Sequence, residues 1–160
     1  MTATLSKSTS TKLHATGRRE YATFYVDELL LGVDLLEICE INRNQETTPA
    51  PQAPAFVNGV INMRGEVITV VDLRKVLRLA DRQESAPCFT VTVSWRSERV
   101  ALLVDRIAEV VSAENGEIDD PPANLAGVGG RFFHGILKLP RDLLIILNTD
   151  AALNPDINPN

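Results

Sequence analysis

The sequence predicts an all-β protein with short helices, built from two pseudo-repeated small barrels of about five strands each that share a hydrophobic core. Three observations predict this fold class. Apolar residues alternate with period two along most of the chain, which is the pattern of half-buried strands. The strands are short and are joined by hairpin signals. The layout of residues 56–77 also returns 76 positions later, as expected for an internal repeat.

The first predicted elements lie before residue 44. Residues 21–26 and 29–33 are apolar runs that flank Asp27-Glu28, which predicts a hairpin. Residues 34–37 predict a helical turn, and residues 38–43 predict an extended segment.

A loop with three prolines, residues 44–55, leads into the second hairpin, because proline is excluded from central strands. Residues 59–63 and 66–71 are β-branched runs separated by Arg64-Gly65. This is the pattern of a tight hairpin in which glycine supplies a positive φ. The register sets Met63 opposite Glu66 and Asn62 opposite Val67. Arg64 is therefore displayed at the tip.

Asp72 is expected to cap a short helix, because its carboxylate can accept a hydrogen bond from an amide of the first turn. The buried face of that helix is predicted from helical spacing to hold Leu73, Val76 and Leu77. The outward face is predicted to hold Arg74, Lys75 and Arg78.

The second half repeats this order. A hairpin at residues 89–95 and 99–104, an extended segment at 108–112 and a long loop at 113–131 precede residues 132–153. The matched pairs are Phe56 with Phe132, Gly59 with Gly135, Asp72 with Asn148 and Leu77 with Leu153. Pro140-Arg141 replaces Arg64-Gly65, so the second turn is of another type, because proline fixes φ near about −65°.

The chain is expected to divide into a disordered N-terminal tail, residues 1–19, a folded body, residues 20–153, and a C-terminal tail, residues 154–160. Within the body, the first repeat covers about 20–79 and the second about 88–153. The N-terminal tail is rich in serine and threonine and holds four cations and no acid. This composition is typical of a mobile tail, and an organellar transit peptide is the alternative.

The body is acidic: without the four tail cations it holds 12 basic and 21 acidic residues, a net charge of −9. This balance argues against a nucleic-acid partner. The longest aliphatic runs, such as residues 143–147, are too short to cross a bilayer, so no direct membrane insertion is expected. Cys39 and Cys88 are expected to be reduced and buried, as in a cytoplasmic protein.

We find no recognisable catalytic or cofactor motif. Two histidines and two cysteines lack the spacing of metal ligands, and His134 is interpreted as a half-buried structural residue. Gly127, Gly129 and Gly130 lack the flanking elements of a phosphate loop and indicate loop flexibility. We therefore expect no catalytic residue, no metal and no cofactor.

Arg64 at a hairpin tip has two interpretations. It can be simply solvated, or it can anchor a protein interface, because arginine combines a planar fork of donors with an apolar stem. Residues 38–41 are expected on the same rim. A pair of Glu40 with Arg64 open to water would contribute about 0–1 kcal/mol, whereas desolvation by a partner helix could make either residue a hot spot of about 2 kcal/mol.

The sequence resembles the CheW family of chemotaxis coupling proteins. The segments that carry the resemblance are Gly32-Val33-Asp34 through Glu40-Ile41, Pro54-Ala55-Phe56-Val57-Asn58-Gly59-Val60-Ile61-Asn62-Met63-Arg64-Gly65, and Val70-Val71-Asp72-Leu73-Arg74. The N-x-R-G hairpin followed by V-D-L-R is the most specific part. The resemblance extends over about residues 20–153 and implies that the two barrels are SH3-like subdomains.

The resemblance implies a non-catalytic adaptor in the cytoplasm, at the inner face of the membrane in receptor arrays. Such proteins join the cytoplasmic tips of chemoreceptors (methyl-accepting chemotaxis proteins) to the regulatory domain of a histidine kinase. They alternate with it in rings, which can include further copies of the coupling protein. The receptor's helical hairpin lies in the groove between subdomains, and the kinase domain binds barrel ends.

The family's functional positions carry over residue by residue. The matching receptor-binding residues are Ile38, Glu40, Gly59, Arg64 and Gly65. Leu125 matches a kinase-binding position, with one residue fewer before Phe132 than in the family pattern.

Two other function classes remain open. One is a peptide-binding double β-barrel adaptor in another two-component pathway, and the other is a small enzyme. A deep pocket with several convergent ionisable groups would indicate the enzyme.

Overall fold

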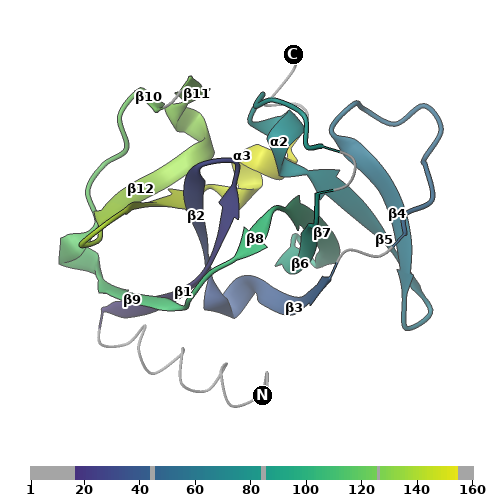
Figure 1. Ribbon diagram of the computed structural model, residues 1–160. Coiled ribbons are helices and arrows are strands. Elements are labelled where there is room, and N and C mark those ends of the chain that lie inside the picture. The colour runs from purple at the N-terminus through teal and green to yellow at the C-terminus, as the bar shows by residue number, and fades with distance from the viewer. Residues whose placement is uncertain (1–16, 44–45, 84–85, 126, 155–160) are drawn as a thin grey trace.

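The computed structural model describes residues 17–43, 46–83, 86–125 and 127–154 (Figure 1). The described chain forms two main sheets and short helices, which confirms the predicted fold class. One sheet, called barrel A, contains β1 (Arg18–Val26), β2 (Leu29–Asp34), β8 (Arg106–Ile107), β9 (Val111–Glu114), β12 (Phe133–Lys138) and β13 (Leu143–Leu147). The other, called barrel B, contains β3 (Ile38–Arg43), β4 (Val57–Met63), β5 (Glu66–Asp72), β6 (Phe89–Trp95) and β7 (Glu98–Val104).

The remaining elements are short. They are the 3-10 helices η1 (Leu35–Glu37), η2 (Asn115–Glu117) and η3 (Gly130–Phe132), the helices α2 (Leu73–Val76) and α3 (Thr149–Leu153), and the small hairpin β10 (Asn124–Leu125) with β11 (Val128–Gly129). Within the described residues, no helix is both long and apolar enough to span a membrane.

Each barrel takes strands from both sequence repeats. Barrel B has the strand order β3-β6-β7-β5-β4, and barrel A has the order β12-β13-β2-β1, with β8 and β9 both on β1. The two orders are equivalent once the first hairpin of each half is exchanged: β1–β2 joins the strands of the second half, and β6–β7 joins those of the first. In Figure 1, barrel A lies on the left and the β4–β5 hairpin of barrel B on the right. The repeats of the sequence are therefore not the barrels of the structure.

The β4–β5 hairpin has the predicted register. Met63 lies opposite Glu66, and Asn62 lies opposite Val67. Arg64 has φ 55° and Gly65 has φ 84°, which is the double positive φ of the tightest hairpin turns. The Asn62 Oδ1 atom accepts a hydrogen bond from the Gly65 amide at 3.0 Å and closes the turn.

Gly59 and Gly135, matched in the sequence, lie where a loop returns to a hairpin. A Cβ on Gly59 would lie 2.5 Å from the carbonyl oxygen of Thr48, which forms a bridge with Val60. A Cβ on Gly135 would lie 2.9 Å from the carbonyl oxygen of Asp119. The two halves therefore share this close backbone approach as well as their strand order.

The core confirms that the two barrels share apolar residues. A cluster shared by both barrels contains Phe24, Leu31, Leu73, Leu102 and Ile145, among others. The opposite faces of the strands line each barrel separately, with Leu30, Leu144 and Ile146 in barrel A and Ile61, Ile68 and Leu103 in barrel B. This alternation follows from the period of two along each strand.

Several expectations from the sequence were wrong. The first strand begins at Arg18, inside the expected tail; residues 1–16 and 155–160 lie outside the described residues. Cys39 and Cys88 are free thiols, but Cys39 is exposed and Cys88 only partly buried. Cys39 lies at the register shift between Ile38 and Glu40, where a bulge interrupts the alternation.

Two further side chains lie differently from their prediction. His134 is exposed and not half-buried; it lies at the register shift between Phe133 and Gly135, both of which are buried. Arg74 was expected on the outward face of α2, but its side chain is only 13% exposed and pairs with Asp105. The tip of β1–β2 reaches this point, since Asp27 lies 3.7 Å from Arg74.

Candidate functional site

Arg64 and Glu40 form a two-pronged ion pair between the tip of β4–β5 and strand β3. The Nη1 atom of Arg64 donates to Oε1 of Glu40 at 2.8 Å, and Nη2 donates to Oε2 at 3.1 Å. The side chain of Arg64 is 73% exposed and that of Glu40 is 21% exposed. The guanidinium is therefore displayed to solvent while the carboxylate is held against the barrel. We call this pair the clasp.

The clasp connects the two ends of an open sheet. β3 and β4 are the first and last strands in the order of barrel B. Thr48 bridges Val60 on the outer side of β4, whereas β3 has no neighbouring strand on its outer side in the described chain. Edge strands leave main-chain donors and acceptors open to other chains. A fork-shaped cation that joins two edges is suited to recognising a further polypeptide, because its exposed face keeps apolar stem and donors accessible.

The other predicted receptor-binding residues lie at different distances from the clasp. Gly65 belongs to the same turn as Arg64. Ile38 is partly buried, packs against the shared core and lies before the bulge that precedes Glu40. Gly59 is near the opposite end of β4, where it lets the Thr48 backbone approach. The structure thus brings Glu40, Arg64 and Gly65 together, with Ile38 further along β3.

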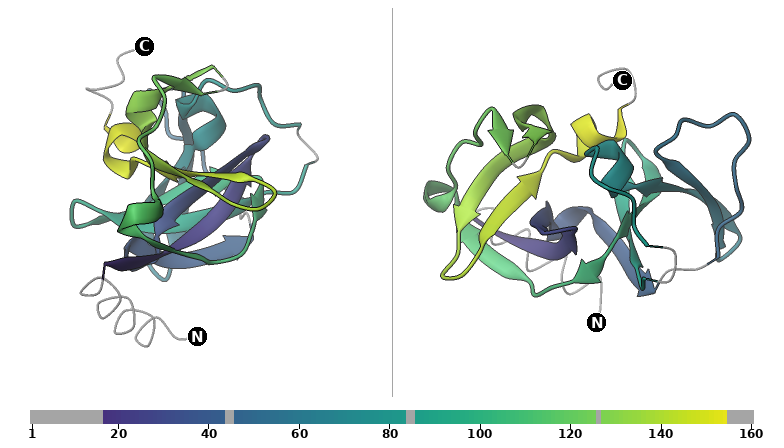
Figure 2. Two further views of the ribbon diagram at one scale, coloured as in Figure 1. Left: turned by 90° about the vertical axis from the view of Figure 1, so that its left-hand side faces the viewer. Right: turned by 45° about the horizontal axis from the view of Figure 1, so that its top comes forward.

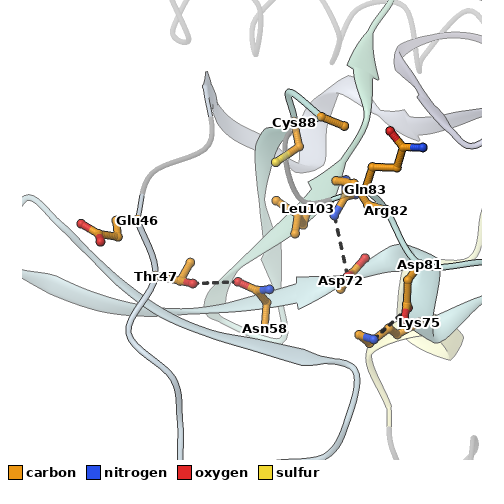
Figure 3. Close-up of a pocket in the computed structure, with 11 residues that line it drawn as sticks. Glu46, Thr47, Asn58, Asp72, Lys75, Asp81, Arg82, Gln83, Cys88 and Leu103 are labelled. Atoms are coloured by element: carbon orange, nitrogen blue, oxygen red, sulfur yellow. Dashed lines mark hydrogen bonds and ion pairs between the residues drawn. The ribbon is translucent and has the colours of Figure 1, made fainter.

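A surface hollow of about 830 Å³ lies over one end of barrel B (Figure 3). Its lining is polar and internally paired: the Thr47 hydroxyl donates to Asn58 Oδ1 at 2.8 Å, Lys75 lies 2.9 Å from Asp81, and Arg82 lies 3.8 Å from Asp72. Burial raises the pKa of the Cys88 thiol in its wall, which makes that thiol a weaker nucleophile at neutral pH. The described lining of the hollow thus consists largely of paired polar side chains and a thiol with a raised pKa.

Metal binding finds no support in the described residues either. They contain no group of three or more histidine, cysteine, aspartate or glutamate side chains that could hold a metal ion.

A half-buried ion network at Asp105 was missed by the sequence reading. Asp105 accepts hydrogen bonds from Arg74 Nη2 at 2.8 Å, from Arg82 Nη2 at 2.8 Å and from the Asp27 amide at 2.6 Å. Burial acts to raise the pKa of Asp105, but the hydrogen bonds from Arg74, the Asp27 amide and Arg82 outweigh it and leave the pKa below its usual range. The network ties the tip of β1–β2 to α2 and to the segment between the halves. Its only sequence signal is that Asp105 stands 71 positions after Asp34, at the matching place after the first hairpin of the second half.

Comparison with known proteins identifies the family of this fold. The CheW-like domain family matches residues 20–156.

The chain belongs to the CheW-like family.

Related proteins match along most of their length. The chain is 30% identical over 133 residues to the chemotaxis protein CheW of Treponema pallidum, covering 81% of this chain and 78% of that protein. It is 30% identical over 134 residues to CheW of Thermotoga maritima, covering 84% and 87%. The crystal structure of the scaffolding protein TtCheW from Thermoanaerobacter tengcongensis superposes with a TM-score of 0.80 at 27% identity, covering 87% of this chain and 94% of that one.

Membership in the CheW-like family removes the enzyme from the function classes left open by the sequence. Members are non-catalytic scaffold proteins of chemotaxis, so the chain is an adaptor and not an enzyme.

Leu125, the position matched to the kinase contact, lies far from the clasp. It belongs to β10, is partly buried and packs against the shared core. Asn124 Oδ1 accepts from the Gly127 amide at 3.1 Å and shapes the turn between β10 and β11. Both Figure 1 and the right-hand view of Figure 2 show β10–β11 and the β4–β5 hairpin on opposite sides of the molecule. A contact at Leu125 and one at Arg64 would therefore involve different surfaces.

Proposed function

We propose that this adaptor couples the cytoplasmic tips of chemoreceptors to the regulatory domain of a chemotaxis histidine kinase. It would act in the cytoplasm, in receptor arrays at the inner face of the membrane. The observation that carries the proposal is the clasp: an exposed arginine, fixed by a half-buried glutamate, at the open edge of one barrel in a CheW-like chain.

The receptor contact is assigned to the groove between subdomains, with the helical hairpin of the receptor docked against Ile38, Glu40 and Arg64. Docking of a helix in a groove relies on apolar anchors flanked by polar contacts. Ile38 supplies apolar surface that continues into the core. A helix that excluded water from the clasp would turn a pair of about 0–1 kcal/mol into a hot spot of about 2 kcal/mol or more. Gly65 and Gly59 contribute by shaping the hairpin that presents Arg64.

The kinase contact is assigned to barrel ends and includes Leu125. Because β10, which contains Leu125, lies on the opposite side of the molecule from the β4–β5 hairpin (Figure 1), one molecule can hold a receptor and a kinase domain together. Further copies of the coupling protein could occupy equivalent places in a ring. This separation of surfaces is what a coupling role needs.

The test uses the intact chain with two purified partners: a receptor cytoplasmic fragment and a kinase regulatory domain. Affinity for each is measured by calorimetry for wild type, Arg64→Glu and Arg141→Glu. Arg141 is the matched control, because it is an exposed arginine at the tip of the equivalent hairpin β12–β13. We expect Arg64→Glu to weaken receptor binding about thirtyfold and to leave kinase binding unchanged, while Arg141→Glu leaves receptor binding intact.

Two results would overturn the proposal. If Arg64→Glu bound the receptor fragment as tightly as wild type, the assignment of the receptor contact to Arg64 and its groove would be wrong. Receptor binding without any kinase binding would indicate a peptide-binding adaptor of another two-component pathway.

A further inference from the structure

The carboxylate of Glu40 has a second donor besides Arg64. The Nδ2 atom of Asn42 donates to Oε2 of Glu40 at 3.1 Å, the same oxygen that accepts from Arg64 Nη2. Arg64 is largely exposed, whereas Asn42 is partly buried on the same strand as Glu40. A partner that draws the guanidinium away would therefore leave Asn42 as the side-chain donor to this carboxylate.

The orientation of the Asn42 amide follows from what it faces. A carboxylate accepts and cannot donate, so the NH2 end must point to Glu40 and the Oδ1 end must point away from it. In this orientation, Oδ1 is buried and has no hydrogen-bond partner within the described residues. The amide side chain thus makes one polar contact and leaves an acceptor unsatisfied.

The inner face of barrel B beside Asn42 is polar. Thr90 lies opposite Asn42 and Thr92 lies opposite Glu40 in the β3–β6 register. Both threonines are fully buried, and their hydroxyl oxygens also lack partners in the described structure. The remaining interior of this barrel is aliphatic, with Ile61 and Ile68 among its members. The polar side chains are therefore concentrated behind the clasp.

An unsatisfied buried acceptor is unfavourable, because burial removes its hydrogen bonds to water without replacing them. A leucine of similar size at position 42 would avoid that penalty. The hydrogen bond to Glu40 is the contact that such a replacement would remove. Features that are locally unfavourable and persist in a folded chain are concentrated at binding sites.

We propose that Asn42 is a positioning residue of the partner-binding site. It holds the Glu40 carboxylate toward the hairpin tip so that Glu40 keeps its place when a partner helix engages Arg64. The inference rests on the proposed receptor contact and adds to it a residue that does not itself touch the receptor. A charged side chain fixed by a second donor loses less conformational entropy on binding than a free one.

The first test is a double-mutant cycle with the receptor cytoplasmic fragment. Asn42→Leu keeps the side-chain size and removes the donor. We expect it to weaken binding about tenfold in the wild-type chain and less than about twofold in a Glu40→Ala background. Asn58→Leu is the matched control, since Asn58 makes a side-chain hydrogen bond in the same barrel away from the clasp. Equal losses in both backgrounds, or no loss in wild type, would overturn the inference.

The second test needs no partner. The Nη signals of Arg64 are followed by NMR in the free protein, where a guanidinium held by two hydrogen bonds to Glu40 rotates less freely than an unpaired one. We expect Asn42→Leu to broaden the Arg64 Nη signals while the backbone amide signals of Ile61 and Ile68 keep their positions. In the control variant Asn58→Leu, the Arg64 signals should be the same as in wild type. If the wild-type protein fails to bind the receptor fragment, the proposed function is wrong, and the positioning role of Asn42 is then judged from this NMR measurement alone. Unchanged Arg64 signals in Asn42→Leu would then overturn the positioning role.

Discussion

The two hairpins β4–β5 and β12–β13 occupy equivalent places in the two barrels but are fastened differently. In barrel B, Arg64 reaches from the tip to Glu40 on the edge strand. In barrel A, the hydroxyl of Tyr25 donates to Asp142 at 2.7 Å, and Arg106 stacks on the Tyr25 ring at 4.1 Å. The position that matches Glu40 is Val111, which is apolar. One scaffold thus carries a tip fastened by an ion pair and a tip fastened by a hydrogen bond from a phenol to a carboxylate.

The residues that the two halves share build the fold, and the pair that they do not share, Arg64 with Glu40, is the one that we propose for partner binding. Gly59 and Gly135, or Asp72 and Asn148, do the same structural work in each half. Arg64 and Glu40 have no counterpart of the same chemistry in the other half. Function resides in sites placed on folds, so comparing matched positions separates the two kinds of residue.

The largest effect should come from the matched aspartates Asp105 and Asp34. Removing Asp105 leaves Arg74 and Arg82 without their main partner, and their side chains are only 13% and 11% exposed. We expect Asp105→Ala to lower the free energy of unfolding by about 3 kcal/mol. Asp34 caps η1 through the Leu36 amide, and Asp34→Ala should lower it by about 1 kcal/mol. Urea unfolding of both variants measures the two losses in free energy of unfolding. Equal losses would show that the Asp105 network stabilises the protein no more than the helix cap at Asp34 does.

The next largest effect is expected at the matched glycines Gly59 and Gly135, whose alanine variants should differ in stability. Gly59 has φ +155°, and its added Cβ would meet backbone, so Gly59→Ala should destabilise the protein by about 2 kcal/mol. At Gly135 an added Cβ would also lie close to its neighbours, 2.6 Å from Cγ2 of Ile118 and 2.9 Å from the Asp119 carbonyl oxygen. Gly135 is not among the glycines with a positive φ, so Gly135→Ala lacks the backbone strain of Gly59→Ala and should have a smaller effect. Thermal unfolding of the two alanine variants measures the difference. A larger loss at Gly135 would contradict this account of the loop contacts.

The pKa values of Glu37 and Asp105 are shifted in opposite directions, so the two carboxyls should change the stability of the protein with pH in opposite directions. Burial raises the pKa of Glu37, and the hydrogen bond from the Thr149 hydroxyl offsets this only in part. A carboxyl with a raised folded pKa contributes stability below its unfolded pKa and loses it as pH rises through the folded value. Glu37→Gln should therefore be more stable than wild type at pH 7, by about 1 kcal/mol, and the two should converge in acid.

Asp105 has a lowered pKa, so its contribution is present above about pH 4 and is lost as pH falls through the folded value. Urea midpoints of wild type, Glu37→Gln and Asp105→Ala from pH 3 to 8 test both signs. Parallel curves for all three proteins would contradict them.

The sequence predicted local geometry well and long-range pairing poorly. The register of β4–β5 follows from a two-residue turn and is encoded locally. The exchange of the first hairpins between the barrels is not encoded locally, because pairings such as β3 with β6 join segments far apart in the chain. The exchanged and the unexchanged arrangement both satisfy the same alternation of apolar residues.

The predicted site shows the same division. Arg64 could be assigned to a tip and Glu40 to its rim, because both follow from neighbouring turns and strands. The Asp105 network was missed because Arg74 and Arg82 reach Asp105 across 31 and 23 residues. Asn42 was missed because its contact depends on the bulge at Ile38 and Glu40, which the alternation of the sequence does not reveal.

The smallest changes in stability are expected from substitutions at the tips of the two hairpins. Arg64→Ala removes a pair whose cation is mostly exposed, so it should change the free energy of unfolding by less than about 1 kcal/mol. Asp142→Ala, which frees the Tyr25 hydroxyl at the other tip, should have a similarly small effect. The two variants should differ in binding instead, with affinity for the receptor fragment lost only in Arg64→Ala. Differential scanning calorimetry and binding calorimetry on the same samples test this. A large loss of stability in Arg64→Ala would mean that the clasp holds the barrel closed and that its exposed cation is structural.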